Sequence, residues 1–99
     1  MLFQVEMLVK VPAHLDPAEF DRLKAEEKAR AEDLQRAGTW RHLWRHVGAY
    51  ANTSIFDVAS NEELHAILTG LPLFPFMDIT VTALCRHPCL LYTSPSPRD

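Results

Sequence analysis

The amino-acid sequence predicts a single α+β domain in which two helices cover one face of an antiparallel sheet. Apolar and polar residues alternate near both ends of the chain, which is typical of strands with one buried face. Two longer segments repeat apolar residues at helical spacing. Between the helices, two strand-like runs flank a turn at Gly48-Ala49. The resulting order, βαββαβ, is the plan of the ferredoxin-like fold.

The first half of the chain contains one strand and one long helix. Apolar residues at every second position from Phe3 to Val11 predict the strand. Asp16 followed by Pro17 fits an N-cap and a proline in the first helical turn. The helix is predicted to run from Asp16 to Gly38, because glycine readily adopts the left-handed conformation that ends helices.

The second half predicts a hairpin, a shorter helix and a last strand. The motif Ser-x-x-Glu, a capping box, marks the start of this helix. A stiff apolar segment containing two prolines connects the helix to the last strand. The predicted elements are the strands 39–47 and 50–58, a helix opened by Ser60, and the strand 77–84.

Composition limits the classes of function. The chain has 99 residues, is 47% hydrophobic and has a net charge of −3. This charge argues against a nucleic-acid partner, which would require a basic surface. No apolar run is long enough to span a membrane, and residues 1–6 do not resemble a signal peptide. We therefore expect a cytoplasmic protein without a membrane partner.

The last residues of the chain form a segment of different character. Residues 89–99 show no periodicity and resemble the translation of a common sequencing-library adapter. A genuine disordered tail, rich in serine and proline, is the alternative. We interpret the segment as a translated adapter and therefore expect residues 1–88 to form the domain and residues 89–99 to be disordered and dispensable. The two cysteines, Cys85 and Cys89, do not suggest a disulfide framework.

Glu27 is the most informative residue of the long helix. On a helical wheel it lies in the middle of the apolar stripe formed by Phe20, Leu23, Ala31 and Leu34. Burying a carboxylate is unfavourable, and an apolar cleft raises its pKa toward the range of a general acid or base. The alternative is a structural ion pair, for instance with Lys24 or an arginine of the sheet.

The second strand of the hairpin carries polar residues on its buried side. Tyr50, Asn52 and Ser54 share a face with Phe56 and Val58 by the two-residue period of a strand. They should therefore point under the helices, toward Glu27. Three hydrogen-bonding groups near one carboxyl group predict a polar pocket. A register slip by one residue would turn them to solvent instead.

The first strand of the hairpin adds two arginines and two histidines. Alternation places Trp40, His42, Trp44 and His46 on one face and Arg41, Leu43 and Arg45 on the other. Arg41 and Arg45 favour a small anionic ligand, or arginine–acid pairs at a subunit interface. The histidines lie on a strand without further ligands at metal spacing, so we expect no metal site.

One further candidate is His65 in the second helix. It lies about a quarter turn from the apolar stripe of that helix. This position suits a proton carrier at the rim of the pocket, or a residue that merely caps the edge of the core.

These residues resemble one known family. The chain is similar to muconolactone Δ-isomerase over residues 1–88, with Phe76 in place of the family's tyrosine. The resemblance implies a ferredoxin-like subunit of a ring-like homodecamer, in the β-ketoadipate pathway of aromatic catabolism, without metal or organic cofactor. The segments that carry it are Glu27-Lys28, Gly38–Arg45, Gly48-x-Tyr50-x-Asn52-x-Ser54, Phe56–Val58, Leu64-His65, Leu71–Ile79 and His87-Pro88.

The resemblance implies a chemical role for the predicted site. The family shifts the ring double bond of muconolactone, a small lactone acid, to give 3-oxoadipate enol-lactone. A base would remove the C4 proton and return a proton at C2. Glu27 is the expected base, with Lys24 and His65 as further catalytic candidates. The expected substrate-binding residues are Tyr50, Asn52, Ser54, Arg41 and Arg45.

Two alternatives remain open at the level of sequence. One is a related enzyme that dehalogenates chlorinated muconolactones, since that reaction would also begin with removal of a proton next to the ring. The other is a non-catalytic ferredoxin-like module that binds a small acid or assembles into a ring.

Overall fold

The computed structural model describes residues 1–91 and confirms the predicted α+β architecture. Residues 92–99, and with them most of the predicted disordered tail, lie outside the described residues. One 3-10 turn was not predicted. The elements in chain order are β1 (Leu2–Val9), α1 (Pro17–Arg36), β2 (Trp40–Arg45), β3 (Ala51–Asp57), α2 (Asn61–Thr69), the 3-10 turn η1 (Phe74–Phe76) and β4 (Met77–Leu84).

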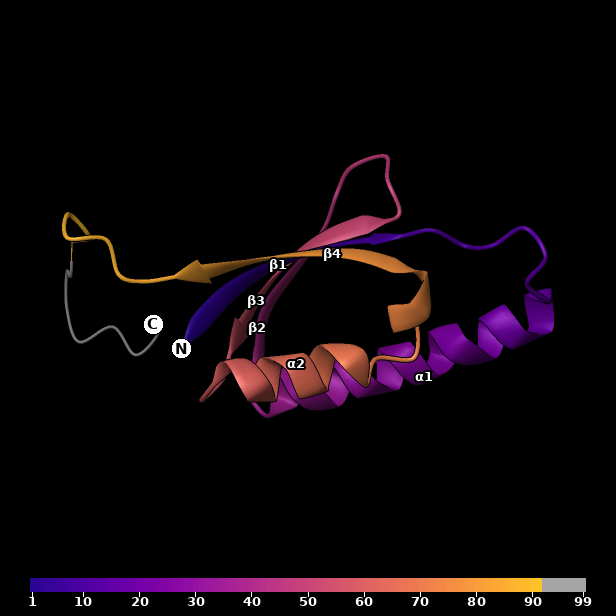
Figure 1. Cartoon of the computed structure of the whole chain (residues 1–99), viewed down its shortest axis with the longest axis horizontal. Coiled ribbons are helices and arrows are strands. Elements are labelled where there is room, and N and C mark those ends of the chain that lie inside the picture. The colour runs from indigo at the N-terminus through magenta and orange to yellow at the C-terminus, as the bar shows by residue number, and fades with distance from the viewer. Residues whose placement is uncertain (92–99) are drawn as a thin grey trace.

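The four strands form one antiparallel sheet, and both helices lie on the same side of it (Figure 1). The strand order is β2-β3-β1-β4, so β1 and β3 occupy the centre. In the register of the central pair, Val5 lies opposite Ser54 and Phe3 opposite Phe56. This register confirms the predicted hairpin phase, because the side chains of Ser54 and Phe56 both face the helices and are fully buried.

The helix termini form as their capping residues predict. A carboxylate oxygen of Asp16 accepts a hydrogen bond from the Glu19 N–H at 3.2 Å. At α2 the Ser60 hydroxyl accepts from the Glu63 N–H at 3.0 Å, and a Glu63 carboxylate oxygen accepts from the Ala59 N–H at 2.6 Å. These bonds satisfy backbone donors that have no partner within the helix.

The hydrophobic core lies between the sheet and the helices. β1 contributes Phe3, Val5 and Met7, of which Val5 and Met7 are at most 1% exposed. α2 contributes an apolar face that is buried along its whole length, formed by Leu64, Ile67 and Leu68. α1 contributes Ala31 and Leu34 near its C-terminal end.

A β-bulge in β2 corrects the predicted face assignment of this strand. Trp40 lies opposite Phe56, but the next paired residue is His42, opposite Ile55. The extra residue, Arg41, shifts the alternation by one position. Trp40 therefore faces the helices, whereas His42 and Trp44 lie on the outer face of the sheet, not on the same side as Trp40 as predicted.

The outer face of the sheet exposes several large apolar side chains. Leu2, Leu8 and Leu84 are each about two-fifths exposed, and Trp44 is 56% exposed. The ring of Trp44 stacks on that of His42, with 5.1 Å between ring centroids. Phe76 lies in η1, before β4 begins.

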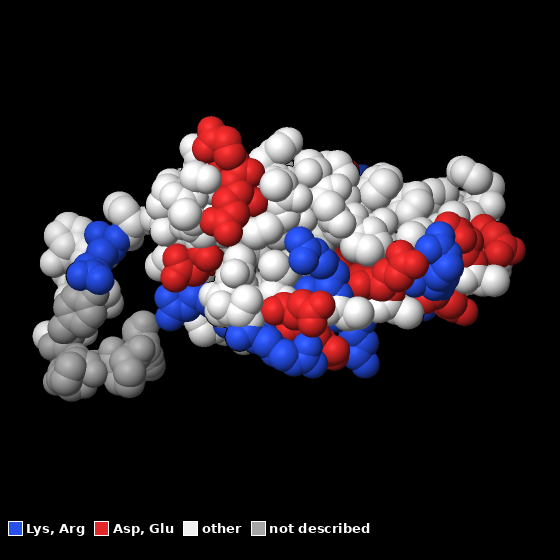
Figure 2. Space-filling model, turned by 90° about the horizontal axis from the view of Figure 1, so that it is seen from below, with Lys and Arg blue, Asp and Glu red and all other residues white. Residues whose placement is uncertain are grey.

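Charged side chains of both signs cover the exposed side of α1 (Figure 2). Arg22 pairs with Glu19 and Glu26, and Lys24 pairs with Asp21 at 3.3 Å. Such pairs at three- and four-residue spacing support a solvated helix surface. Within residues 1–91, no helix combines the length and apolarity needed to cross a membrane.

Candidate active site

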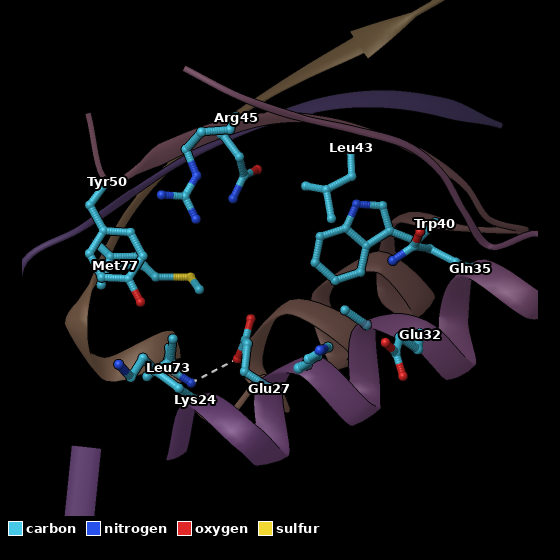
Figure 3. A pocket seen from close by; sticks show the side chains of 14 residues that line it. Lys24, Glu27, Glu32, Gln35, Trp40, Leu43, Arg45, Tyr50, Leu73 and Met77 are labelled. Carbon is cyan, nitrogen blue, oxygen red and sulfur yellow. Dashed lines mark hydrogen bonds between the residues drawn. The ribbon is translucent and has the colours of Figure 1, made fainter. Parts of the chain in front are cut away.

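A cavity of about 520 Å³ opens between α1, the β2–β3 hairpin and the segment that precedes β4 (Figure 3). Its volume falls in the range of roughly 300–1,000 Å³ that suits small molecules. Both polar and apolar side chains of α1 and the sheet line it. The lining residues are Val9, Lys24, Glu27, Lys28, Ala31, Glu32, Gln35, Trp40, Leu43, Arg45, Tyr50, Asn52, Leu73 and Met77.

Glu27 extends from α1 into the floor of this cavity (Figure 3). The helical period places it on the same side as the buried Ala31 and Leu34, and its side chain is half-buried. One oxygen, Oε1, accepts a hydrogen bond of 3.0 Å from the backbone N–H of Leu73. Burial raises the pKa of the Glu27 carboxyl above its ordinary value, and the Leu73 N–H opposes that rise in part.

The polar residues of β3 form a short hydrogen-bonded series beside the cavity. The Ser54 hydroxyl donates to Oδ1 of Asn52 at 2.7 Å, and Ser54 is fully buried. Nδ2 of Asn52 contacts the Met7 sulfur at 3.7 Å. Ser54 thereby orients the Asn52 amide, which lines the cavity.

Arg45 and Tyr50 lie across the cavity from Glu27 (Figure 3). The Arg45 guanidinium carbon lies 5.2 Å from the centre of the Tyr50 ring, within the range of a cation–π contact. Lys24 lies one helical turn before Glu27, with Nζ 4.7 Å from the Phe20 ring. Phe20 in turn packs edge-on against Tyr50.

The opposite end of the cavity combines the apolar side chains of Trp40 and Leu43 with Glu32 and Gln35 of α1 (Figure 3). Trp40 is 2% exposed and packs on Phe56 with 4.7 Å between ring centroids. Its Nε1 is buried and has no hydrogen-bond partner among the described residues. Leu43 lies beside Trp40 on the cavity wall (Figure 3). The cationic Arg45 and the aromatic wall of Trp40 therefore lie at different ends of the cavity.

The structure brings together five of the eight site residues predicted from the sequence. Three do not line the cavity. Arg41 is the bulge residue, and its guanidinium pairs with Asp57 at 3.6 Å. His65 is exposed on α2, outside the cavity. Ser54 acts on the cavity only through Asn52. The five lining residues are Lys24, Glu27, Arg45, Tyr50 and Asn52.

The sequence did not identify the apolar wall or the backbone donor of this site. Trp40 and Leu43 join the wall because the bulge changes the phase of β2. The Leu73 N–H has no side-chain signature at all, although the prolines at positions 72 and 75 indicated a stiff segment. Within residues 1–91, no three His, Cys, Asp or Glu side chains cluster as a metal site would require.

A comparison with known protein families decides the affiliation. The family model described as muconolactone delta-isomerase matches residues 1–89. The chain belongs to the muconolactone isomerase family. Its members include the muconolactone Delta-isomerase of Pseudomonas aeruginosa, which is 59% identical over 93% of this chain and 96% of that protein. The enzyme of the same name from Pseudomonas putida is 57% identical over 94% and 97%.

A solved structure supports the same affiliation. A crystal structure of muconolactone isomerase superposes with a TM-score of 0.89 at 58% identity, covering 95% of this chain and 98% of that one. The muconolactone isomerase resemblance found in the sequence and the ferredoxin-like fold it implied are both confirmed.

Proposed function

We propose that this chain catalyses the isomerisation of muconolactone to 3-oxoadipate enol-lactone, with Glu27 as the base. The observation that carries this proposal is a half-buried carboxyl group with a raised pKa, placed in a cavity of small-molecule size in a chain of this family. A carboxyl group whose pKa is raised by burial is better suited both to accept and to return a proton.

The reaction needs only proton transfers. Glu27 removes the proton from C4 of the lactone, and the electron pair spreads through the conjugated ring onto the carbonyl oxygen as a dienolate. The protonated Glu27 then returns a proton at C2, which shifts the double bond. Atoms and charge balance without an oxidant or reductant, so the proposed step requires neither a metal nor an organic cofactor.

The end of the cavity that holds Arg45 suits the carboxylate arm of the substrate. Arg45 offers planar donors that match a carboxylate, and Lys24 adds a second positive charge on the same cavity. Tyr50 and Asn52, which line the cavity, are the proposed donors to the lactone oxygens and to the developing dienolate. One well-placed donor to such an oxyanion is worth about 2.7–4 kcal/mol.

Arg41, His65 and Ser54 take no direct part in this proposal. The first pairs with Asp57 and the second is exposed on α2, so neither lies with Glu27. Ser54 contributes by holding Asn52.

We also propose that the chain forms a cytoplasmic homo-oligomer through the outer face of its sheet. The exposed leucines of this face and Trp44 form an apolar surface of the kind that is covered in assemblies. The decamer that the family resemblance implies would cover it with other copies of this chain. Light scattering after gel filtration should give a mass several times that of the monomer, and a monomer would contradict the proposal.

The catalytic proposal is tested by following muconolactone consumption by absorbance. The wild-type protein should convert it to the enol-lactone, and Glu27→Gln should lower kcat by about 10²–10⁴-fold. Glu26→Gln is the matched control, because Glu26 lies next in sequence but pairs with Arg22 on the exposed side of α1. Equal activity of Glu27→Gln and wild type would exclude Glu27 as the base, and an inactive wild type would contradict the function.

A further inference from the structure

The segment between α2 and β4 contacts Glu27, the proposed base, through the backbone N–H of Leu73. Leu73 is 3% exposed, and its N–H donates to Oε1 of Glu27 across 46 positions of sequence. The backbone beside it is fixed by two short-range bonds, from the Phe74 N–H to the Leu71 carbonyl at 2.9 Å and from the Phe76 N–H to the Leu73 carbonyl at 2.9 Å. Pro72 and Pro75 further restrict this segment.

The bond gives the two oxygens of the Glu27 carboxyl group different surroundings. Oε1 is directed to the Leu73 N–H, whereas the other oxygen points toward the middle of the cavity (Figure 3). In the charged state the N–H donates to a carboxylate oxygen, and in the neutral state it donates to the carbonyl oxygen of the acid. The same bond can therefore persist while the cavity-facing oxygen gains and loses a proton.

We propose that the Leu73 N–H is a positioning group for the base, which holds Oε1 of Glu27 so that only Oε2 exchanges the proton with the substrate. This inference rests on the proposed isomerisation and specifies how its base is held. Glu27 provides the hydrogen-bond acceptor that the buried Leu73 N–H requires. In return, the bond prevents rotation of the Glu27 carboxyl group and keeps the proton off Oε1.

The other charged and titratable groups around the cavity do not replace this contact. Lys24, Lys28 and Glu32 lie on α1 with Glu27, Arg45 lies on β2, and Tyr50 precedes β3. α2 contributes none of the lining residues, and the segment before β4 contributes Leu73. All of these side chains stay in place when only the backbone donor of Leu73 is changed.

The test is a backbone ester at position 73, made by replacing Leu73 with the corresponding α-hydroxy acid. This removes the N–H and keeps the side chain. We expect kcat on muconolactone to fall by about tenfold or more with little change in KM. The acidic limb of the pH profile of kcat/KM should move to higher pH by about one unit, because a donor to the charged form is lost.

Two controls isolate the donor. An ester at Gly70 removes a backbone N–H whose partners are the Ala66 and Ile67 carbonyls at the end of α2, away from the cavity. Leu73→Met keeps the N–H and nearly the volume of the buried side chain. Both should leave the acidic limb where the wild type has it. Equal kcat and equal pH profiles for the esters at positions 73 and 70 would overturn the proposal.

A second measurement needs neither activity nor an altered backbone. In protein labelled with 15N-leucine, the Leu73 amide resonance should shift with pH as Glu27 titrates, and this shift should vanish in Glu27→Gln. A Leu73 amide resonance whose chemical shift does not change with pH in the wild type would overturn the proposal. A wild type that does not convert muconolactone would contradict only the proposed function, and the amide titration would still decide whether Leu73 holds Glu27.

Discussion

The packing side of the molecule, formed by β1 and α2, and the cavity side, formed by α1, β2 and β3, share the same periodic pattern of inward-facing positions. They differ in the residues that fill these positions. In β1 and α2, the positions that face the core carry apolar side chains, such as Val5, Met7 and Leu68, and these are buried. In α1, β2 and β3, comparable positions carry Glu27, Arg45 and Asn52, and a cavity lies between them. Polar residues in otherwise apolar positions therefore mark where this small domain has a cavity in place of close packing.

The largest effect expected on the packing side is a loss of stability. Leu68→Ala should lower the free energy of unfolding by about 2–5 kcal/mol, because it removes buried methyl groups and leaves a cavity. Urea unfolding measures the change. The folded fraction should keep the wild-type kcat, since Leu68 does not line the site.

His65→Ala provides the matched control on the same helix. His65 is exposed, so its removal should change the free energy of unfolding by less than about 0.5 kcal/mol and leave kcat unchanged. A large loss of activity in this variant would restore His65 as a catalytic residue and would break the division between the two sides.

A smaller effect separates the two arginines of β2. Arg45→Gln should raise KM for muconolactone by about 10–100-fold, because a charged hydrogen bond to the substrate carboxylate is lost. Arg41→Gln should leave KM near the wild-type value, since Arg41 pairs with Asp57 away from the cavity. Steady-state kinetics of both variants test this, and the reverse order would place the carboxylate at Arg41.

The smallest effect is a pH dependence of stability that originates on the cavity side. The raised pKa of Glu27 means that the folded state binds this proton more tightly than the unfolded chain does. Relative to Glu27→Gln, the wild type should be most stable below the ordinary pKa of 4.5 and should lose that advantage as pH rises through the raised pKa.

Urea unfolding of both proteins between about pH 4 and about pH 8 measures this difference. A difference that stays constant, or that grows in favour of the wild type as pH rises, would show that folding does not raise the pKa of Glu27.

The sequence was sufficient for the fold and for much of the cavity because both depend on local periodicity. The stripe around Glu27 and the alternation of Asn52, Ser54 and Phe56 each place side chains by position along one element. The caps at Asp16 and Ser60 likewise act within a few residues. Such patterns can be recognised in the sequence without knowing how the helices and strands pack together.

The features that the sequence did not predict depend on contacts between elements. The bulge at Arg41 becomes visible only when β2 is paired with β3, because one strand alone does not show which residue lacks a partner. The bond from Leu73 to Glu27 joins a backbone group to a residue 46 positions away, and a backbone donor has no residue type. His65 was misplaced because its distance from the cavity depends on how α2 lies on the sheet.

The bulge in β2 also has a consequence for how this cavity can evolve. If Arg41 were deleted, Trp40 would still lie opposite Phe56 and His42 opposite Ile55, so regular pairing would keep Leu43 and Arg45 on the cavity wall and His42 and Trp44 on the outer face. Loss of this single codon would remove the ion pair with Asp57 and leave the wall as it is. The bulge is therefore the position at which β2 can change length without changing the surface that faces the cavity.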